Sequence, residues 1–76
     1  MQNPIRKDVV EIIGLILKTS VNMKTARASN PNWDSLSHME LIFTLEDRFS
    51  LEFPEEKIGE LDTVKKIVEF IEDGRQ

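Results

Sequence analysis

The chain reads WDSLSHMELIFTLEDRF over residues 33–49, and this stretch decides the fold. Asp34 suits the N-cap position of a helix, because its carboxylate can accept from the free backbone N–H groups of the first turn. Helical periodicity then places four apolar side chains on one arc that would face a core: Leu41, Ile42, Leu45 and Phe49. A helix is therefore predicted to start at Asp34 and run to about Phe49.

The same helix carries a second apolar stripe, formed by Leu36, Met39 and Phe43, on its far side. Glu40, Thr44 and Asp47 would line the flank between this stripe and the polar face. A helix in a small bundle needs one apolar stripe, and a surplus stripe often marks an interaction site. Packing of the second stripe against a loop is the alternative interpretation.

Three further helical segments are predicted from caps and periodicity. The first starts at Asn3-Pro4, with proline at the first helical position, and ends near Lys18 or Thr19. Its inward residues are predicted to be Ile5, Val9, Ile12, Ile13, Ile16 and Leu17. Residues 55–60 follow Pro54 and would form a short helix at most. The last helix is expected from Thr63 to about Asp73, capped by Asp62, stopped by Gly74 and facing inward through Val64, Ile67, Val68 and Ile71.

Residues 20–32 are polar, lack sustained periodicity and end in Asn30-Pro31-Asn32, so they are predicted to form a long loop. Val21 and Met23 would hold this loop against the core. No convincing strand is present. We expect an all-α fold: a small four-helix bundle with three main helices, one short helix and a long loop between the first two. Residues 1–76 are expected to form a single domain.

Composition excludes several classes of function. The chain has no cysteine and one histidine, which excludes thiolate or histidine-cluster metal sites and a cysteine nucleophile. The net charge is +3 over residues 1–33 and −7 over residues 34–76. The acidic half is a poor match for nucleic acid and would suit partners with basic patches, but charge alone favours a role in keeping a small helical domain soluble. The short apolar runs and an N-terminus without a signal pattern predict a soluble, cytoplasmic protein that does not span a membrane.

The chain resembles the acyl carrier protein family, and the resemblance covers nearly its whole length in the right order. It rests on these segments: Asp34-Ser35-Leu36, Met39-Glu40-Leu41, Leu45-Glu46-Asp47-Arg48-Phe49, Phe53-Pro54-Glu55-Glu56 and Thr63-Val64. The resemblance implies that Ser35 carries a covalent 4′-phosphopantetheine arm, which a phosphopantetheinyl transferase moves from coenzyme A using Mg²⁺. It implies a carrier that presents acyl thioesters to acyl-transferring and condensing enzymes, and not an enzyme.

The residues around Ser35 make physical sense of that role. A phosphodiester at the first helical position would lie at the positive end of the helix dipole. Asp34 would cap the helix and, by the resemblance, help the transferase to engage Ser35. Partner enzymes would contact the apolar stripe and the acids beside it, which are Leu36, Met39, Phe43, Glu40, Glu46 and Asp47. No catalytic residue and no resident metal is expected, and the carrier is expected to be a monomer.

Ser35 and the residues around it also have other interpretations. Ser35 could be an ordinary helix-start serine, and the chain a helical adaptor that binds proteins through Leu36, Met39 and Phe43 without any arm. A Ser35/His38 hydrolase lacks an orienting acid, an oxyanion hole and a pocket in so small a bundle. Trp33 is expected to pack back on the helix start, and His38 to pack beneath it or face the arm.

The resemblance also has departures. Many carriers of fatty acid synthesis read Asp-Leu-Gly-Ala before the Asp-Ser-Leu, where this chain reads Ser-Asn-Pro-Asn-Trp over residues 29–33. Lys24 and Arg27 make the loop basic, and Arg48 interrupts the acids of the second helix. The Gly-Gly-His-Ser-Leu type of motif found in peptidyl carriers is absent. These departures favour a carrier of a specialised pathway, such as polyketide, lipid-modification or cell-surface glycan synthesis.

Overall fold

A computed structural model describes residues 4–74, which form four α-helices and no β-strand. The helices are α1 (Pro4–Leu17), α2 (Ser35–Phe49), α3 (Glu55–Ile58) and α4 (Val64–Gly74), and a single 3-10 turn, η1 (Arg27–Ser29), interrupts the loop after α1. The predicted all-α fold, with three main helices and one short one, is confirmed. The cap expected at Asn3 lies outside the described residues.

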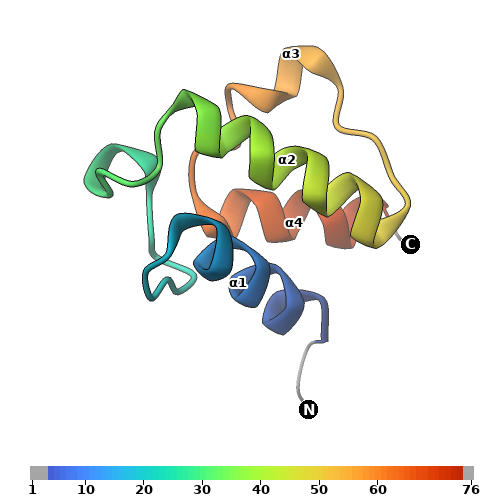
Figure 1. The fold of residues 1–76 in the computed structure, drawn as a ribbon. Helices are drawn as coiled ribbons and strands as arrows, with labels where there is room; N and C mark the ends of the chain where they lie inside the picture. The colour runs from blue at the N-terminus through green and yellow to red at the C-terminus, as the bar shows by residue number, and fades with distance from the viewer. Residues whose placement is uncertain (1–3, 75–76) are drawn as a thin grey trace.

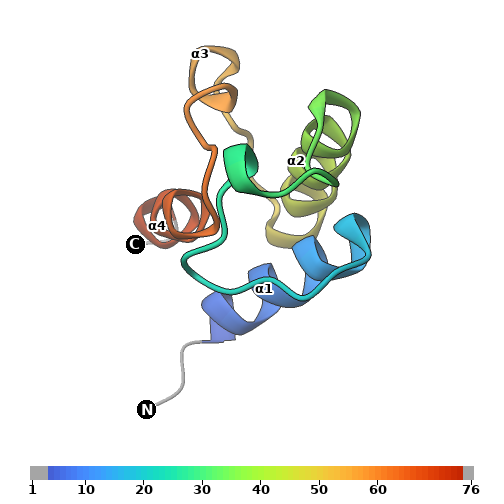
Figure 2. The ribbon, with the colours of Figure 1, turned by 90° about the vertical axis from the view of Figure 1, so that its left-hand side faces the viewer.

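The three long helices pack around one core (Figure 1). Helices α2 and α4 point the same way along the molecule, and α1 runs in the opposite sense across both of them, contacting each. The segment that contains α3 runs from the end of α2 back to the start of α4 (Figures 1 and 2). This crossover brings the last residue of α3 close to α2, where the Ile58 carbonyl lies 2.7 Å from His38 Nε2.

The core is made of the inward stripes that the periodicity predicts. Every predicted inward residue of α2 and α4 is buried, and in α1 the buried residues are Val9, Ile13 and Leu17. Ile5, Ile12 and Ile16 lie at the edge of the core and are partly buried. Trp33, Phe53 and Leu61 join the core from the connecting segments. The core therefore draws on the connections as well as on the helices.

Helices α1 and α2 end in the same way. Lys18 has φ 58° and Ser50 has φ 54°, so the residue after each helix adopts the left-handed conformation. The next residue's N–H then turns back to a helix carbonyl, from Thr19 to Gly14 and from Leu51 to Glu46, each at 3.2 Å. This is the hydrogen bond of a Schellman motif, which usually has glycine at the left-handed position.

The loop between α1 and α2 is fastened to the start of α4. Ala26 and Thr63 form an isolated antiparallel bridge, Arg27 N–H donates to the Asp62 carbonyl at 2.8 Å, and Val64 N–H donates to the Thr25 carbonyl at 3.0 Å. Val21 and Met23 pack against the core, as predicted. The long loop is thus held at defined points along its length.

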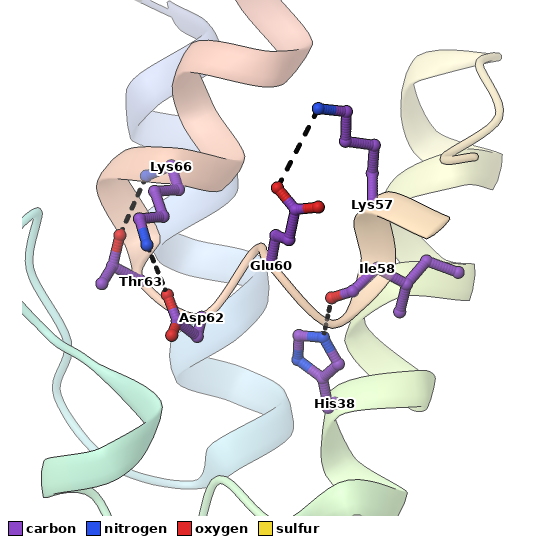
Figure 3. A network of polar contacts seen from close by, with 7 residues as sticks. All are labelled: His38, Lys57, Ile58, Glu60, Asp62, Thr63 and Lys66. Atoms are coloured by element: carbon purple, nitrogen blue, oxygen red, sulfur yellow. Dashed lines mark hydrogen bonds and ion pairs between the residues drawn. The ribbon is translucent and has the colours of Figure 1, made fainter. Parts of the chain in front are cut away.

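The predicted cap of α4 is wrong by one residue. The Thr63 hydroxyl accepts from the backbone N–H of Lys66 at 3.0 Å, so Thr63 is the N-cap and α4 starts at Val64. The Asp62 carboxylate instead accepts from the Lys66 ammonium at 2.9 Å (Figure 3). Asp62 precedes this cap, and its backbone carbonyl accepts from the Arg27 N–H at 2.8 Å.

Candidate functional site

Ser35 is the first residue of α2, and its side chain is exposed. Asp34 is the N-cap, with extended backbone angles, and its carboxylate accepts from the backbone N–H of Ser37 at 2.8 Å. That hydrogen bond lowers the pKa of Asp34 from its ordinary value of 3.8, because it stabilises the charged carboxylate. The predicted cap and the predicted position of Ser35 are therefore confirmed as structure.

Arg27 lies beside the Ser35 hydroxyl. Its guanidinium Nη2 donates to Ser35 Oγ at 3.0 Å. The contact joins η1 to the start of α2 across eight positions of the chain. In the sequence Arg27 stands out only as part of a basic loop, since no short-range spacing relates it to Ser35.

Trp33 and His38 form a buried polar chain beneath the start of α2. Their side chains are 2% and 3% exposed, and Trp33 Nε1–H donates to His38 Nδ1 at 2.9 Å. His38 Nε2 lies 2.7 Å from the Ile58 carbonyl at the end of α3 (Figure 3). An indole nitrogen can only donate and a carbonyl can only accept, so the imidazole carries its proton on Nε2. Both ring nitrogens of His38 then have hydrogen-bond partners, and the bond to Ile58 links α2 to α3.

This geometry argues against the Ser35/His38 hydrolase. A general base must reach the hydroxyl that it activates, directly or through a water. Both His38 ring nitrogens are taken, by Trp33 and by Ile58, while Ser35 Oγ is bonded to Arg27. His38 therefore packs beneath the helix start, which was one of its two expected positions. Among residues 4–74, His, Asp and Glu side chains form no group suited to hold a metal ion.

The second apolar stripe of α2 lies at the surface. Leu36 is 79% exposed and Phe43 is 59% exposed, while Met39 is partly buried. Two large apolar side chains in water on a helix of this size satisfy no packing requirement of the core. The stripe is consequently available to another molecule, on the same helix as Ser35.

The three acidic residues predicted to face partners differ in their surroundings. Glu40 and Asp47 are exposed. Glu46 is partly buried, and its carboxylate accepts from the backbone N–H of Phe53 at 2.8 Å. Glu46 therefore has a role inside the molecule, where it secures the segment after α2. Arg48, which interrupts these acids, pairs with Asp8 of α1 at 2.8 Å.

These features fit a covalent arm on Ser35. The hydroxyl is exposed, it lies at the positive end of a 15-residue helix, and a guanidinium stands next to it. The first backbone N–H groups of a helix have no partner within the helix, and here the Asp34 carboxylate accepts from that of Ser37. A phosphodiester on Ser35 would find donors and favourable charge on the chain itself. The arm would supply a thiol, which the chain otherwise lacks because it has no cysteine.

Comparison with known proteins defines the class. The family model described as "Phosphopantetheine attachment site" matches residues 33–71, about half of the chain, which include Ser35 and all of α2 and α3. The chain belongs to this family, which is that of the acyl carrier proteins, as the sequence resemblance predicted. The group that this membership implies is covalently attached 4′-phosphopantetheine.

Two curated relatives agree with this assignment. The chain is 46% identical over 41 residues to the acyl carrier protein of Helicobacter hepaticus, a match that covers 54% of each chain. It is 43% identical over 44 residues to the acyl carrier protein of Thermosynechococcus vestitus, a match that covers 58% of this chain and 54% of the relative. The matched part thus spans about half the length of the curated relatives.

Proposed function

We propose that this chain is an acyl carrier whose single domain covers residues 1–76 and whose 4′-phosphopantetheine arm is attached to Ser35. The arm's terminal thiol would hold acyl groups as thioesters and present them to biosynthetic enzymes. The observation that carries the proposal is the exposed Ser35 hydroxyl at the capped start of α2, inside the segment that matches the family. The chain itself performs no chemistry on the cargo in this proposal.

The attachment step uses the serine hydroxyl as the nucleophile. Ser35 Oγ attacks the phosphorus of coenzyme A that bears the pantetheine, and the new Oγ–P bond replaces the P–O bond of the diphosphate. Adenosine 3′,5′-bisphosphate leaves, and the hydroxyl proton passes to a base of the transferase. Arg27 donates to one lone pair of Oγ, which leaves the hydroxyl hydrogen free to point toward that base.

The proposed partners are a phosphopantetheinyl transferase and the acyl-transferring and condensing enzymes of a biosynthetic pathway. Leu36, Met39 and Phe43 would supply the apolar contact, with Asp34, Glu40, Glu46 and Asp47 as the charged surroundings. The exposure of Leu36 and Phe43 supports this assignment. Charges at the rim of an interface set the association rate and the choice of partner more than the affinity. A carrier that must dock, deliver and leave benefits from that balance.

The pathways proposed are fatty acid, polyketide or other specialised lipid and secondary metabolism, and a specialised pathway is favoured over general fatty acid synthesis. The support for a specialised pathway is the basic loop with Lys24 and Arg27 and the Trp33 that precedes Asp34. A cytoplasmic location belongs to the same proposal, since coenzyme A must reach the chain. Among residues 4–74, no helix combines the length and the apolar character needed to cross a membrane.

Intact mass spectrometry tests the attachment. The apo protein is incubated with coenzyme A, Mg²⁺ and a transferase of broad specificity, and one phosphopantetheine should be added. Ser35→Ala should abolish the gain in mass. The matched control is Ser37→Ala, which removes another serine hydroxyl of the same helix and should retain the gain. A gain that persists in Ser35→Ala, or no gain at all, would refute the site.

The second candidate is a helical adaptor that binds proteins through the exposed stripe and carries no arm. The 79% exposure of Leu36 and the 59% exposure of Phe43 favour an interaction surface of some kind. The adaptor predicts that Ser35→Ala leaves partner binding and cellular function intact, and that protein from the native host has only its unmodified mass. The carrier predicts the opposite result for each measurement.

A further inference from the structure

The environment of Arg27 differs from that of an ordinary surface arginine. Its backbone is fixed on both sides, because its N–H donates to the Asp62 carbonyl at 2.8 Å and its carbonyl accepts from Asn30 N–H at 3.2 Å. The residue begins η1 and is partly buried. The guanidinium is therefore presented from an anchored position and not from a free loop.

Arg48 pairs with Asp8, Lys57 with Glu60 and Lys66 with Asp62, whereas Arg27 forms no ion pair with the residues that the structure describes. The hydrogen bond that its guanidinium makes there goes to Ser35 Oγ, a neutral hydroxyl. A guanidinium carries several more N–H donors in a planar fork, whose geometry matches two oxygens of a phosphate. The site thus holds a positive charge without an anion, next to the atom that the arm would esterify.

We propose that Arg27 binds the phosphodiester of the arm once Ser35 is modified, which rests on the proposed attachment at Ser35. Esterification places the phosphorus one bond beyond Oγ, and Oγ already lies 3.0 Å from Nη2. A small rotation of the arginine side chain would let the fork donate to the non-bridging phosphate oxygens. Arg27 is thus a positioning residue, which would hold the base of the arm between η1 and the positive end of α2.

The alternative is that Arg27 acts only as a general positive charge on the loop. Lys24 provides the comparison, since it lies on the same loop and carries the same charge, and its residue is exposed. The backbone N–H of Lys24 donates to Asn22 Oδ1 at 2.8 Å. Substitution of Lys24 removes one positive charge, as substitution of Arg27 does, but it leaves the Arg27 guanidinium beside Ser35.

The test compares the apo and holo forms of the full chain by thermal unfolding, after mass spectrometry has confirmed the modification of each sample. In the wild type, modification should raise the midpoint by roughly 2–6 °C at low salt, because a charge-assisted bond forms. In Arg27→Gln most of this increase should disappear, in Arg27→Lys part of it should remain, and in Lys24→Gln it should be unchanged. The phosphorus-31 resonance of the holo protein should shift in Arg27→Gln and stay in place in Lys24→Gln.

The two proposals can fail separately. No mass gain on wild-type Ser35 refutes the attachment site itself. Full modification of the wild type and of Arg27→Gln, with equal increases in midpoint and an identical phosphorus resonance, refutes the role of Arg27 and leaves the attachment intact. Equal losses in Arg27→Gln and Lys24→Gln would also refute it, since they would show a general charge effect. Far-ultraviolet circular dichroism of each apo variant checks that the helices are intact.

Discussion

The two hydrogen bonds that join Trp33 to His38 and His38 to Ile58 should contribute substantially to stability, and His38→Leu tests this. Leucine fills a similar volume and keeps the position apolar, but it can neither accept from Trp33 Nε1–H nor donate to the Ile58 carbonyl. The substitution therefore removes the polar connection between α2 and α3 with little change in packing volume.

The size of the effect follows from what each partner loses. Trp33 Nε1 lies in the core, so its unsatisfied N–H should cost about 1–3 kcal/mol. The bond to the Ile58 carbonyl is only partly buried, so water can replace it and the loss is about 0.5–1.5 kcal/mol. Together we expect His38→Leu to lower the free energy of unfolding by about 1.5–4.5 kcal/mol. A domain of 76 residues has roughly 4–11 kcal/mol in total.

Urea unfolding followed by circular dichroism at the helix band measures this change. The matched control is Leu36→Ala on the same helix, which removes an exposed side chain and should cost less than about 0.5 kcal/mol. A double-mutant cycle with Trp33→Phe isolates the buried bond. In that background the N–H is already absent, so His38→Leu should cost at least about 1 kcal/mol less than it does in the wild type.

Two results would contradict this expectation. In the first, the free energy of unfolding of His38→Leu lies within about 0.5 kcal/mol of the wild-type value. In the second, His38→Leu costs the same with Trp33 and with Phe at position 33. Either result would mean that the imidazole contributes by its volume alone, and that the hydrogen bonds at 2.9 and 2.7 Å are energetically neutral.

Three further predictions concern the ends and the surface of the helices. The pKa of Asp34 is lowered in the folded chain, so the contribution of its carboxylate to stability is complete above about pH 4 and is lost as the pH falls through the folded pKa. Asp34→Asn keeps the cap and should therefore lose less stability than the wild type between about pH 5 and pH 2, which acid titrations of the urea midpoint measure. Lys18→Gly should gain about 0.5–1 kcal/mol of unfolding free energy, because glycine adopts a φ of 58° without strain, whereas Ser20→Gly should gain nothing. Leu36→Ala with Phe43→Ala should leave the urea midpoint nearly unchanged but raise the transferase KM for the carrier by about fivefold or more, and an unchanged KM would refute the docking stripe.

Much of the fold could be predicted because its signals are local. The cap at Asp34 and the three-to-four spacing of Leu41, Leu45 and Phe49 both act within a few residues, and the structure has them as expected. The cap of α4 was missed because Asp62 and Thr63 are both good caps. The choice between them depends on the bridge to Ala26, which is distant in sequence.

The polar environment of Ser35 was beyond sequence reasoning for the same reason. Arg27 reaches Ser35 only because the loop is fastened to the start of α4. The bond of His38 to Ile58 likewise depends on the path of the chain after α2. The left-handed residues at Lys18 and Ser50 gave no signal, since neither is the glycine that this conformation usually selects.

The burial of Trp33 gives the molecule an optical reporter of its own. The chain has one tryptophan and no tyrosine, so emission excited near the red edge of the indole band comes from a single position. That position lies two residues before Ser35, packed in the core with its N–H on His38. Loss of the bond to His38, or movement of α3 away from α2, would change the polarity around the indole. Loading of the arm and docking of an enzyme could therefore be followed in solution without any label.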